Sequence, residues 1–477
     1  MVFFLTVLFV FSANAVSLTE QSLIELSKKD TPHNYDQLAK VLSANFQKRE
    51  YENNYGLKIT AEGKHERTKQ KPLISFSPVF SPVTQAGVGV SKNLFYGMNI
   101  NASVGYDKRD FLFLGSNTFR ETVVGQVGLN IDLWRDLFGR KSRSRQEQMK
   151  TSLKMKELEK KTADQQYKIN IRKMYWNLVA NKEKLILAKK LYQQSIVQAT
   201  QIKQRYKNSI ADKGDVANIN SLVANRKGQI ISLEYQRSQM HTRLQTMIPN
   251  LLGKNIVIGD YDIPNAMKKV LSCTQKIKMY KQAPYENTYM DEVIDYIKQL
   301  YNLESKVTSI YGDPDLKLAL AAKTTGVGDE SINATDDFQD NDRSGYSVGL
   351  QLTIPVGYED AKTKDIKKSY ERNKHLAAIT NTETQLKATH MNIVTSIDHL
   401  FAVIAAQKEN NANLQTKMNV TKKKYKQGRI SLSELIQDQD KYLGGELNVI
   451  DTKLMILETV FNYLSVYSTT PCELNRI

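Results

Sequence analysis

The chain has 477 residues, of which 41% are hydrophobic, and carries a formal net charge of +17. Its mean hydropathy is −0.46, and no run of about 20 apolar residues follows the N-terminal region, which excludes a helical membrane protein. Cys273 and Cys472 are the only cysteines, too few for a disulfide-rich scaffold, and no Cys-x-x-Cys pair exists for a zinc ribbon.

The N-terminus has the pattern of an export signal. Apolar residues 2–11 precede Ser12-Ala13-Asn14-Ala15, a small-x-small cleavage site, so we expect residues 1–15 to be removed. No Lys or Arg precedes the apolar run, and a buried strand or helix is the alternative interpretation. Export of a polar chain leaves the periplasm, the medium or an outer-membrane β-barrel as destinations.

Two regions, residues 55–133 and 315–354, show the two-residue period of β-strands. A clear case is the alternation of Met98, Ile100, Ala102, Val104 and Tyr106 with polar or small neighbours. Strands of about ten residues with one apolar and one polar face suit a transmembrane barrel with a polar lumen, although a soluble sandwich gives the same pattern. The first region contains an apparent extra hairpin at residues 83–107, which we expect to extend the outer mouth rather than add membrane strands.

Two long tracts, residues 140–207 and 360–426, contain neither proline nor glycine. Each permits a helix of more than 60 residues and about 100 Å, far longer than the usual globular helix of about 11 residues. Residues 215–245 and 431–467 would form return helices, so each long helix is predicted to turn back as a hairpin.

An internal repeat relates the two halves. At an offset of about 219 residues, Arg205-Tyr206-Lys207 aligns with Lys424-Tyr425-Lys426 and a heptad stripe stays in register. At an offset of about 221, residues 127–129 align with 348–350. The sequence therefore predicts a duplicated unit of strand, strand, long helix and return helix.

This order resembles the TolC family of outer-membrane efflux channels. The most specific matching pieces are residues 128–140, residues 349–357 and the two hairpin tips. The resemblance implies a mixed α/β channel in which three protomers complete a 12-stranded transmembrane β-barrel that continues into a periplasmic coiled-coil barrel of α-helices. It further implies a passive conduit that works with a periplasmic adaptor protein and an inner-membrane pump in efflux or type I secretion.

The expected segments follow from this resemblance. They are a signal peptide (1–15), N-terminal periplasmic helices (16–54), a first β-barrel segment with the extra hairpin (55–139), a first long helical hairpin (140–254), an equatorial segment (255–312), a second β-barrel segment (313–358), a second long helical hairpin (359–468) and a C-terminal tail (469–477). The alternative is a secreted or periplasmic coiled-coil interaction protein with a β-sandwich head.

The hairpin tips, residues 206–215 and 425–434, are the candidate functional site. By resemblance, acids at the tips would ring the closed periplasmic aperture and a tyrosine would latch neighbouring hairpins; three copies of an acid attract cations. The candidate gate residues are Asp215, Glu434, Asp438, Tyr425 and Arg429. The candidate adaptor-docking residues are Ser209, Gly214, Gly428 and Ser431.

The tips also depart from the family pattern. Ser209 replaces the usual glycine, Arg429 follows Gly428 directly, and Gln437 stands where a second acid can occur, with Asp438 beside it. The alternative interpretation of Asp215 and Glu434 is a favourable charge in the first turn of a helix.

Other segments add little chemistry. The sequence has no catalytic signature such as His-Glu-x-x-His or Gly-x-Ser-x-Gly, so we expect no enzyme, no cofactor and no metal. The basic run 140–145 would favour lipid phosphates of the outer membrane over nucleic acid. The acidic segment 328–344 lacks calcium-loop spacing and is expected to be an outward-facing loop. Cys273 and Cys472 could pair in an oxidising compartment.

Overall fold

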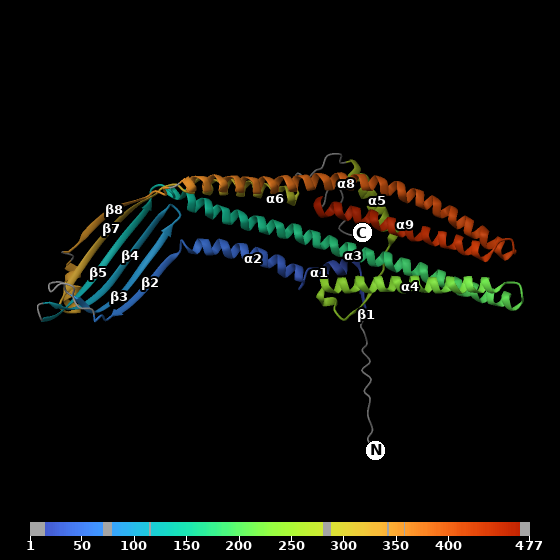
Figure 1. The fold of residues 1–477 in the computed structure, drawn as a ribbon, viewed down its shortest axis with the longest axis horizontal. Helices are drawn as coiled ribbons and strands as arrows, with labels where there is room; N and C mark the ends of the chain where they lie inside the picture. Colours follow the sequence, from blue (N-terminus) through green and yellow to red (C-terminus); the bar gives the residue numbers. More distant parts are fainter. Residues whose placement is uncertain are drawn as a thin grey trace, which may run out of the picture. The chain divides into compact units, whose positions relative to one another are not determined.

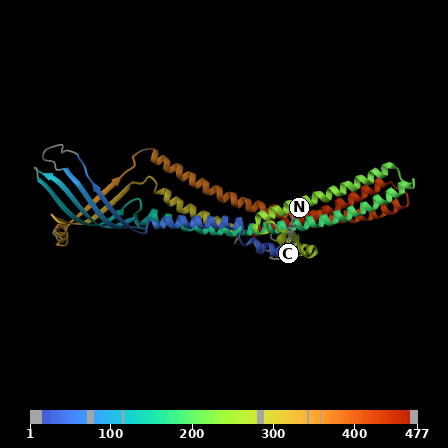
Figure 2. The same ribbon diagram turned by 90° about the horizontal axis from the view of Figure 1, so that it is seen from below.

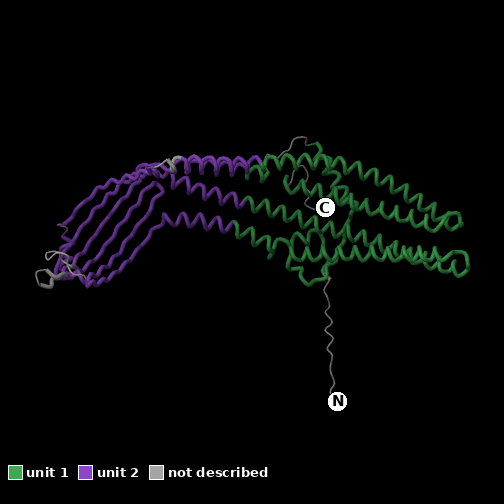
Figure 3. The backbone as a smooth tube through the Cα atoms, viewed as in Figure 1, with its two compact units in different colours: residues 1–40, 158–293, 381–477 green, residues 41–157, 294–380 purple. Residues whose placement is uncertain are grey.

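The computed structural model describes residues 15–69, 79–113, 116–279, 288–340, 343–356 and 358–467. The chain forms two compact units (Figure 3). The helical unit comprises Met1–Lys40, Leu158–Val293 and Asn381–Ile477, and the sheet unit comprises Val41–Glu157 and Ile294–Thr380. No helix in the described part of the chain is both long and apolar enough to cross a membrane.

The sheet unit contains one curved, single-layered antiparallel sheet of six strands (Figures 1 and 2). The strand order is β2-β3-β4-β5-β7-β8. The strands of this sheet therefore lie side by side in the order in which they occur along the chain. The strands are β2 (Leu57–Glu66), β3 (Val79–Leu94), β4 (Met98–Phe113), β5 (Ser116–Asp132), β7 (Asp315–Gly328) and β8 (Gly345–Thr353).

The register of this sheet separates apolar from polar side chains. Because side chains alternate between faces, residues that pair across strands share a face. One cross-strand row is apolar along its length: Ile59, Val90, Ala102, Val127, Ala322 and Tyr346. The next row, on the opposite face, is small or polar: Thr60, Gly89, Ser103, Gln126, Lys323 and Gly345. The predicted alternation is thus present across all six strands.

The extra hairpin is part of the sheet, and the expected extension of the outer mouth is wrong. β3 pairs with β2 over the whole of β2, and β4 pairs with β5 from Met98 to Phe113. Both strands of the hairpin therefore have neighbours on each side and carry the same two faces as the other strands. The sequence suggested an extension because the two halves were expected to supply two strands each.

The acidic segment between β7 and β8 is also not a simple loop. Residues Ser331–Asp340 form helix α7, which packs on β7 with Ala334 fully buried. The Asp337 carboxylate accepts a hydrogen bond from the Val327 N–H at 2.6 Å. Gly326 has no side chain where the Ala334 backbone approaches, and any Cβ there would collide with it. The glycine therefore allows α7 to pack closely on β7.

Long helices follow the sheet as the sequence predicted. Helix α3 covers Arg140–Lys207 after the short helix η1 (Leu137–Gly139), and α8 covers Tyr358–Lys426. They return as α4 (Lys213–Met247) and α9 (Leu432–Tyr467). Helix α2 (Pro32–Asn53) leads into β2, and α6 (Tyr289–Ser309) leads into β7.

The helical unit has a core built from segments far apart in sequence. Short strands β1 (Ala15–Leu18) and β6 (Asn255–Ile258), which the sequence did not reveal, pair in parallel. Helices α1 (Glu20–Ser27) and α5 (Ile263–Met279) and the short helix η2 (Pro249–Leu251) complete this region. Buried members of the core include Leu23, Ile171, Leu178, Leu244, Val270 and Phe461. Cys273 is buried in α5, whereas Cys472 lies outside the described residues.

A buried ion pair ties the first helix to this core. Arg172 of α3 is 2% exposed and donates from Nε to the Glu20 carboxylate of α1, which is 8% exposed. The Arg172 guanidinium also lies over the Phe461 ring of α9, 4.5 Å from its centroid. Three chain segments thus meet at one cation, which is shielded from water.

We expect Glu20→Ala to lower the free energy of unfolding of the helical unit by about 3–5 kcal/mol, because the Arg172 cation would remain buried without its partner. Denaturant unfolding followed by circular dichroism measures this change. The matched control is Glu25→Ala, since Glu25 pairs with Lys28 at 3.0 Å on the surface, where the loss should stay below about 1 kcal/mol. Equal losses in the two variants would contradict the assigned role.

Candidate functional site at the tips of the helical hairpins

The turn of the first hairpin, between α3 and α4, is closed by backbone hydrogen bonds. The Ile210 N–H donates to the Arg205 carbonyl at 2.8 Å, and the Ser209 N–H donates to the Tyr206 carbonyl at 3.0 Å. Ser209 has φ +60°, the left-handed conformation that usually requires glycine. Asp212 then caps α4, because its carboxylate accepts from the Asp215 N–H at 2.7 Å.

The turn of the second hairpin, between α8 and α9, has the same pattern. The Arg429 N–H donates to the Lys424 carbonyl at 2.9 Å, and Gly428 takes the left-handed position with φ +74°. Ser431 Oγ accepts from the Glu434 N–H at 3.2 Å and so caps α9. Ser209 and Gly428 are therefore equivalent positions, and so are Asp212 and Ser431.

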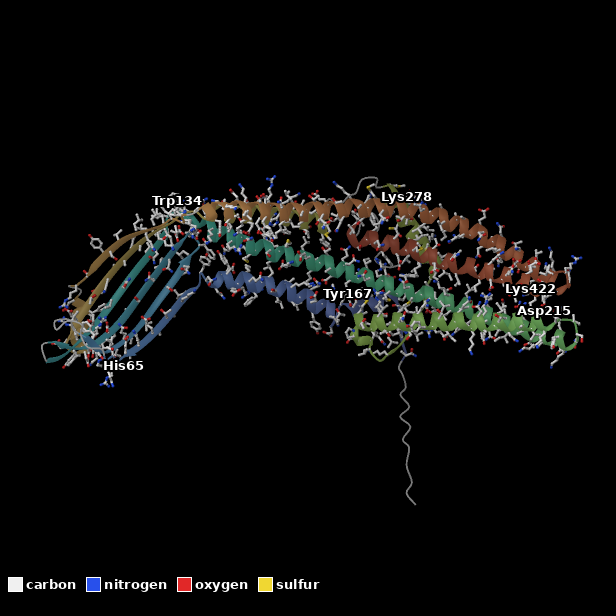
Figure 4. All side chains as sticks on the ribbon, viewed as in Figure 1. His65, Trp134, Tyr167, Asp215, Lys278 and Lys422 are labelled. Carbon is white, nitrogen blue, oxygen red and sulfur yellow. The ribbon has the colours of Figure 1, made fainter. Side chains whose placement is uncertain are left out.

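The two hairpins of one protomer pack together near their tips. A small apolar cluster joins α3 and α4 to α9, and Tyr425 of α8 lies against it. Its buried members are Ala199, Ile202, Ile219, Leu222 and Leu432. The tips are thus held as one structural element rather than as two independent ends. Figure 4 labels Asp215 at the end of the first hairpin.

Tyr425 lies near two charged residues of the first hairpin, Asp215 and Arg205, and the sequence did not reveal the second of them. The Arg205 guanidinium of α3 lies 5.3 Å from the centroid of the Tyr425 ring. Burial raises the pKa of the Tyr425 hydroxyl, and the charges of Arg205 and Asp215 act on it in opposite directions. Tyr425 of the second hairpin thus contacts Arg205 of the first hairpin within one protomer.

Asp438 does not belong to the surface of the tip. It is 3% exposed, inside the second hairpin, and accepts hydrogen bonds from Lys417 Nζ at 2.8 Å and Thr421 Oγ1 at 2.7 Å. Burial by itself raises the pKa of the Asp438 carboxyl, but the bonds from Lys417 and Thr421 outweigh it and hold that pKa below its usual value. The expectation that Asp438 is an aperture acid is wrong, because its side chain is buried against α8, the other helix of the same hairpin.

The remaining predicted residues are exposed at the tips. Glu434 lies in the first turn of α9, and Arg429 follows the left-handed Gly428. Gly214 lies in the first turn of α4, where a Cβ would come 3.0 Å from the Asp212 carboxylate. Within the described residues no side-chain hydrogen bond or ion pair joins Glu434 to Asp215, so the two acids are separate features of the tip.

A second ion pair, also missed from the sequence, joins the hairpins farther from the turns. Arg226 of α4 is 3% exposed and donates to the Asp440 carboxylate of α9. Its position follows Ile219 and Leu222 at three- and four-residue steps on the buried stripe of α4. An arginine on such a buried stripe needs an acidic partner. Its place on the stripe is therefore the feature of the sequence that could have indicated this ion pair.

The described residues contain no group of three or more His, Cys, Asp or Glu side chains that could hold a metal ion.

We expect Ser209→Gly to raise the stability of the first hairpin by up to about 1 kcal/mol, because glycine adopts the left-handed conformation without the serine Cβ penalty. Gly428→Ser should lower the stability of the second hairpin by a similar amount. Thermal unfolding measures both. Ser433→Gly, at an exposed right-handed position in the first turn of α9, is the control and should be destabilising. A loss of stability from Ser209→Gly as well would contradict the strain at Ser209.

The low pKa of the Asp438 carboxyl predicts that the second hairpin loses stability in acid. A depressed carboxyl pKa stabilises the fold above the unfolded pKa of about 4, and this stabilisation disappears as the pH falls through the folded pKa. At neutral pH, Asp438→Asn should cost about 1–3 kcal/mol by weakening the charge-assisted bonds. The measurement is the difference in melting temperature between pH 7 and pH 3.5, which should shrink in Asp438→Asn but not in the exposed control Gln437→Ala. An unchanged difference in Asp438→Asn would contradict this role.

No family model matches the sequence, and no curated protein matches it. Solved structures match over nearly the whole chain. The outer membrane protein VceC from Vibrio cholerae is 11% identical, with a TM-score of 0.64 over 94% of this chain and 95% of that one. The CmeC outer membrane channel of Campylobacter jejuni is 12% identical, with a TM-score of 0.65 over 95% of this chain and 88% of that one.

The MtrE outer membrane channel of Neisseria gonorrhoeae, solved in its open state, is also similar. It is 12% identical, with a TM-score of 0.62 over 96% of this chain and 91% of that one. At such identities the likeness concerns the fold. The chain has the fold of outer-membrane channel proteins, as its resemblance to the TolC family predicted.

Proposed function

We propose that the protein is a passive outer-membrane channel of a tripartite efflux or type I secretion system. Three copies assemble, their sheets form the membrane pore, and their helices form a tunnel in the periplasm. An inner-membrane pump supplies the energy and a periplasmic adaptor docks at the hairpin tips. The likeness in fold to outer-membrane channels supports this assignment.

The observation that carries the proposal is the exposed apolar face of the single-layered sheet. Val127 at the centre is 57% exposed, and Val348 near one edge is 66% exposed. A soluble protein rarely leaves so continuous an apolar surface open, whereas lipid covers it at no cost. The alternative of a β-sandwich head is wrong for the described residues, because all six long strands belong to one sheet and no second sheet covers this face.

Basic residues where the strands join the helices fit the edge of a membrane. Arg143 lies over the Tyr96 ring at 5.6 Å, and Lys367 lies over the Tyr311 ring at 4.9 Å. Aromatic and basic residues together are typical of the membrane–water boundary, where lipid phosphates attract the cations. Nucleic acid is not needed to explain the net charge of +17.

The tips form the periplasmic aperture. Asp215 and Glu434 each become a ring of three acids in the trimer, and the exposed turns at Ser209, Gly214, Gly428 and Ser431 contact the adaptor. A ring of like charges in a narrow passage attracts cations and repels itself when the passage narrows. The closed state therefore depends on contacts such as that between Arg205 and Tyr425.

We expect the unsubstituted protein to form cation-selective channels in planar bilayers. Asp215→Asn combined with Glu434→Gln should lower the cation preference or raise the single-channel conductance, because two rings of negative charge are removed. The matched control is Glu409→Gln, an exposed acid on α8 away from the tips, which should leave both quantities unchanged.

Two outcomes would contradict the proposal at different levels. Absence of any conductance from protein that sediments with outer membranes would refute the channel function. Channels whose currents and selectivity are identical before and after removal of both acids would leave Asp215 and Glu434 as ordinary charges at helix starts.

A further inference from the structure

We infer that three copies of this chain close an 18-stranded outer pore, wider than the 12-stranded barrel that the family resemblance implies. The inference rests on the proposed trimer and concerns the size of cargo that the outer mouth admits. It is carried by the six-stranded sheet of a single protomer, whose extra hairpin is fully integrated between β2 and β5.

The two edges of the sheet need partners. Within the described residues, β2 and β8 are paired on one side only, and every residue of both strands is exposed. In a bilayer each unpaired backbone group costs several kcal/mol, so open edges do not occur in lipid. A second copy of the chain offers the complementary edge.

The direction and faces of the edge strands allow this closure. Six strands that alternate in direction leave β2 and β8 antiparallel, so β8 of one copy can pair with β2 of the next in the ordinary antiparallel manner. Leu57 and Ile59 on β2 share the apolar face with Val348 and Leu350 on β8. The joined sheet would thus continue one lipid-facing surface and one polar lumen.

The strand count sets the width of the pore. Three copies of six strands make 18, and barrel diameter grows roughly in proportion to strand number. The outer mouth should therefore be about 1.5 times as wide as that of a 12-stranded barrel, within the range in which barrels enclose an open aqueous channel. The polar face supports this, because small residues such as Gly89, Ser103 and Gly128 line it. Cargo of this channel would include hydrophilic solutes or extended polypeptides too broad for the narrower barrel.

The topology supplies a direct comparison. Removal of Val79–Phe113, which covers β3 and β4, would bring β2 and β5 together as antiparallel neighbours joined at the outer end of the sheet. Each protomer would then contribute four strands. Uncharged polymers of graded size, added on the side of the outer mouth in a planar bilayer, report the width of that mouth through their exclusion from the current.

We expect the polymer cut-off radius of the full chain to be about 1.5 times that of the deletion variant. An equal cut-off in the two proteins would overturn the inference while leaving the channel function intact, whereas absence of current from the full chain would refute the proposed function itself. The mass of the detergent-solubilised assembly gives the copy number; two copies would make a barrel of only 12 strands and would also overturn the inference.

A pair of point variants keeps the inference testable when the deletion variant does not insert. Ser103→Cys lies on the polar face of β4 and Val104→Cys on its apolar face. A charged, membrane-impermeant thiol reagent should change the current through Ser103→Cys channels and not through Val104→Cys channels, with the unsubstituted protein as the reagent control. No response in Ser103→Cys would show that the extra hairpin lies outside the pore wall.

Discussion

Pairing of backbone hydrogen-bonding groups across the sheet is the constraint on which the rest of the structure depends. A strand can meet lipid only when both of its edges are paired, and it can separate lipid from water only when its side chains alternate. All six strands meet the second requirement in one register, from Ile59 to Tyr346. Four of the strands have both edges paired inside one protomer, whereas β2 and β8 have one edge each without a partner in the described sheet. These two strands therefore define where further copies must join.

The sequence predicted the helices closely because their determinants are local. Absence of proline and glycine permits a long helix, and the predicted bounds of residues 140–207 coincide with α3. The turns were also readable in part: Gly428 occupies the left-handed position that a helix end requires. Ser209 occupies the equivalent position without the residue type that would have signalled it, because the surrounding turn enforces the conformation.

Features that depend on distant partners were not predictable. Strand number per protomer was misjudged because alternation identifies strands but does not say which strands pair. The location of Asp438 was misjudged because neighbouring residues of a helix point in different directions. Gln437 is exposed, whereas the next residue, Asp438, is buried against α8. Strand β1, the pairing of Arg226 with Asp440 and the contact of Arg205 with Tyr425 each join segments far apart in the chain.

The buried carboxylate of Asp438 has a further consequence for how the chain selects its helix pairs. Asp438 and Thr421 occupy the positions that Ile219 and Ile202 hold in the first hairpin, at an offset of 219 residues. In the same place on α3, Ile202 stands for Thr421 and Gln198 stands for Lys417, so the Asp438 carboxylate would lose its hydroxyl donor and its cationic partner there. Two hairpins of similar length and pattern could otherwise exchange their return helices during synthesis. This polar layer therefore favours the pairing of α9 with α8 at the level of Asp438.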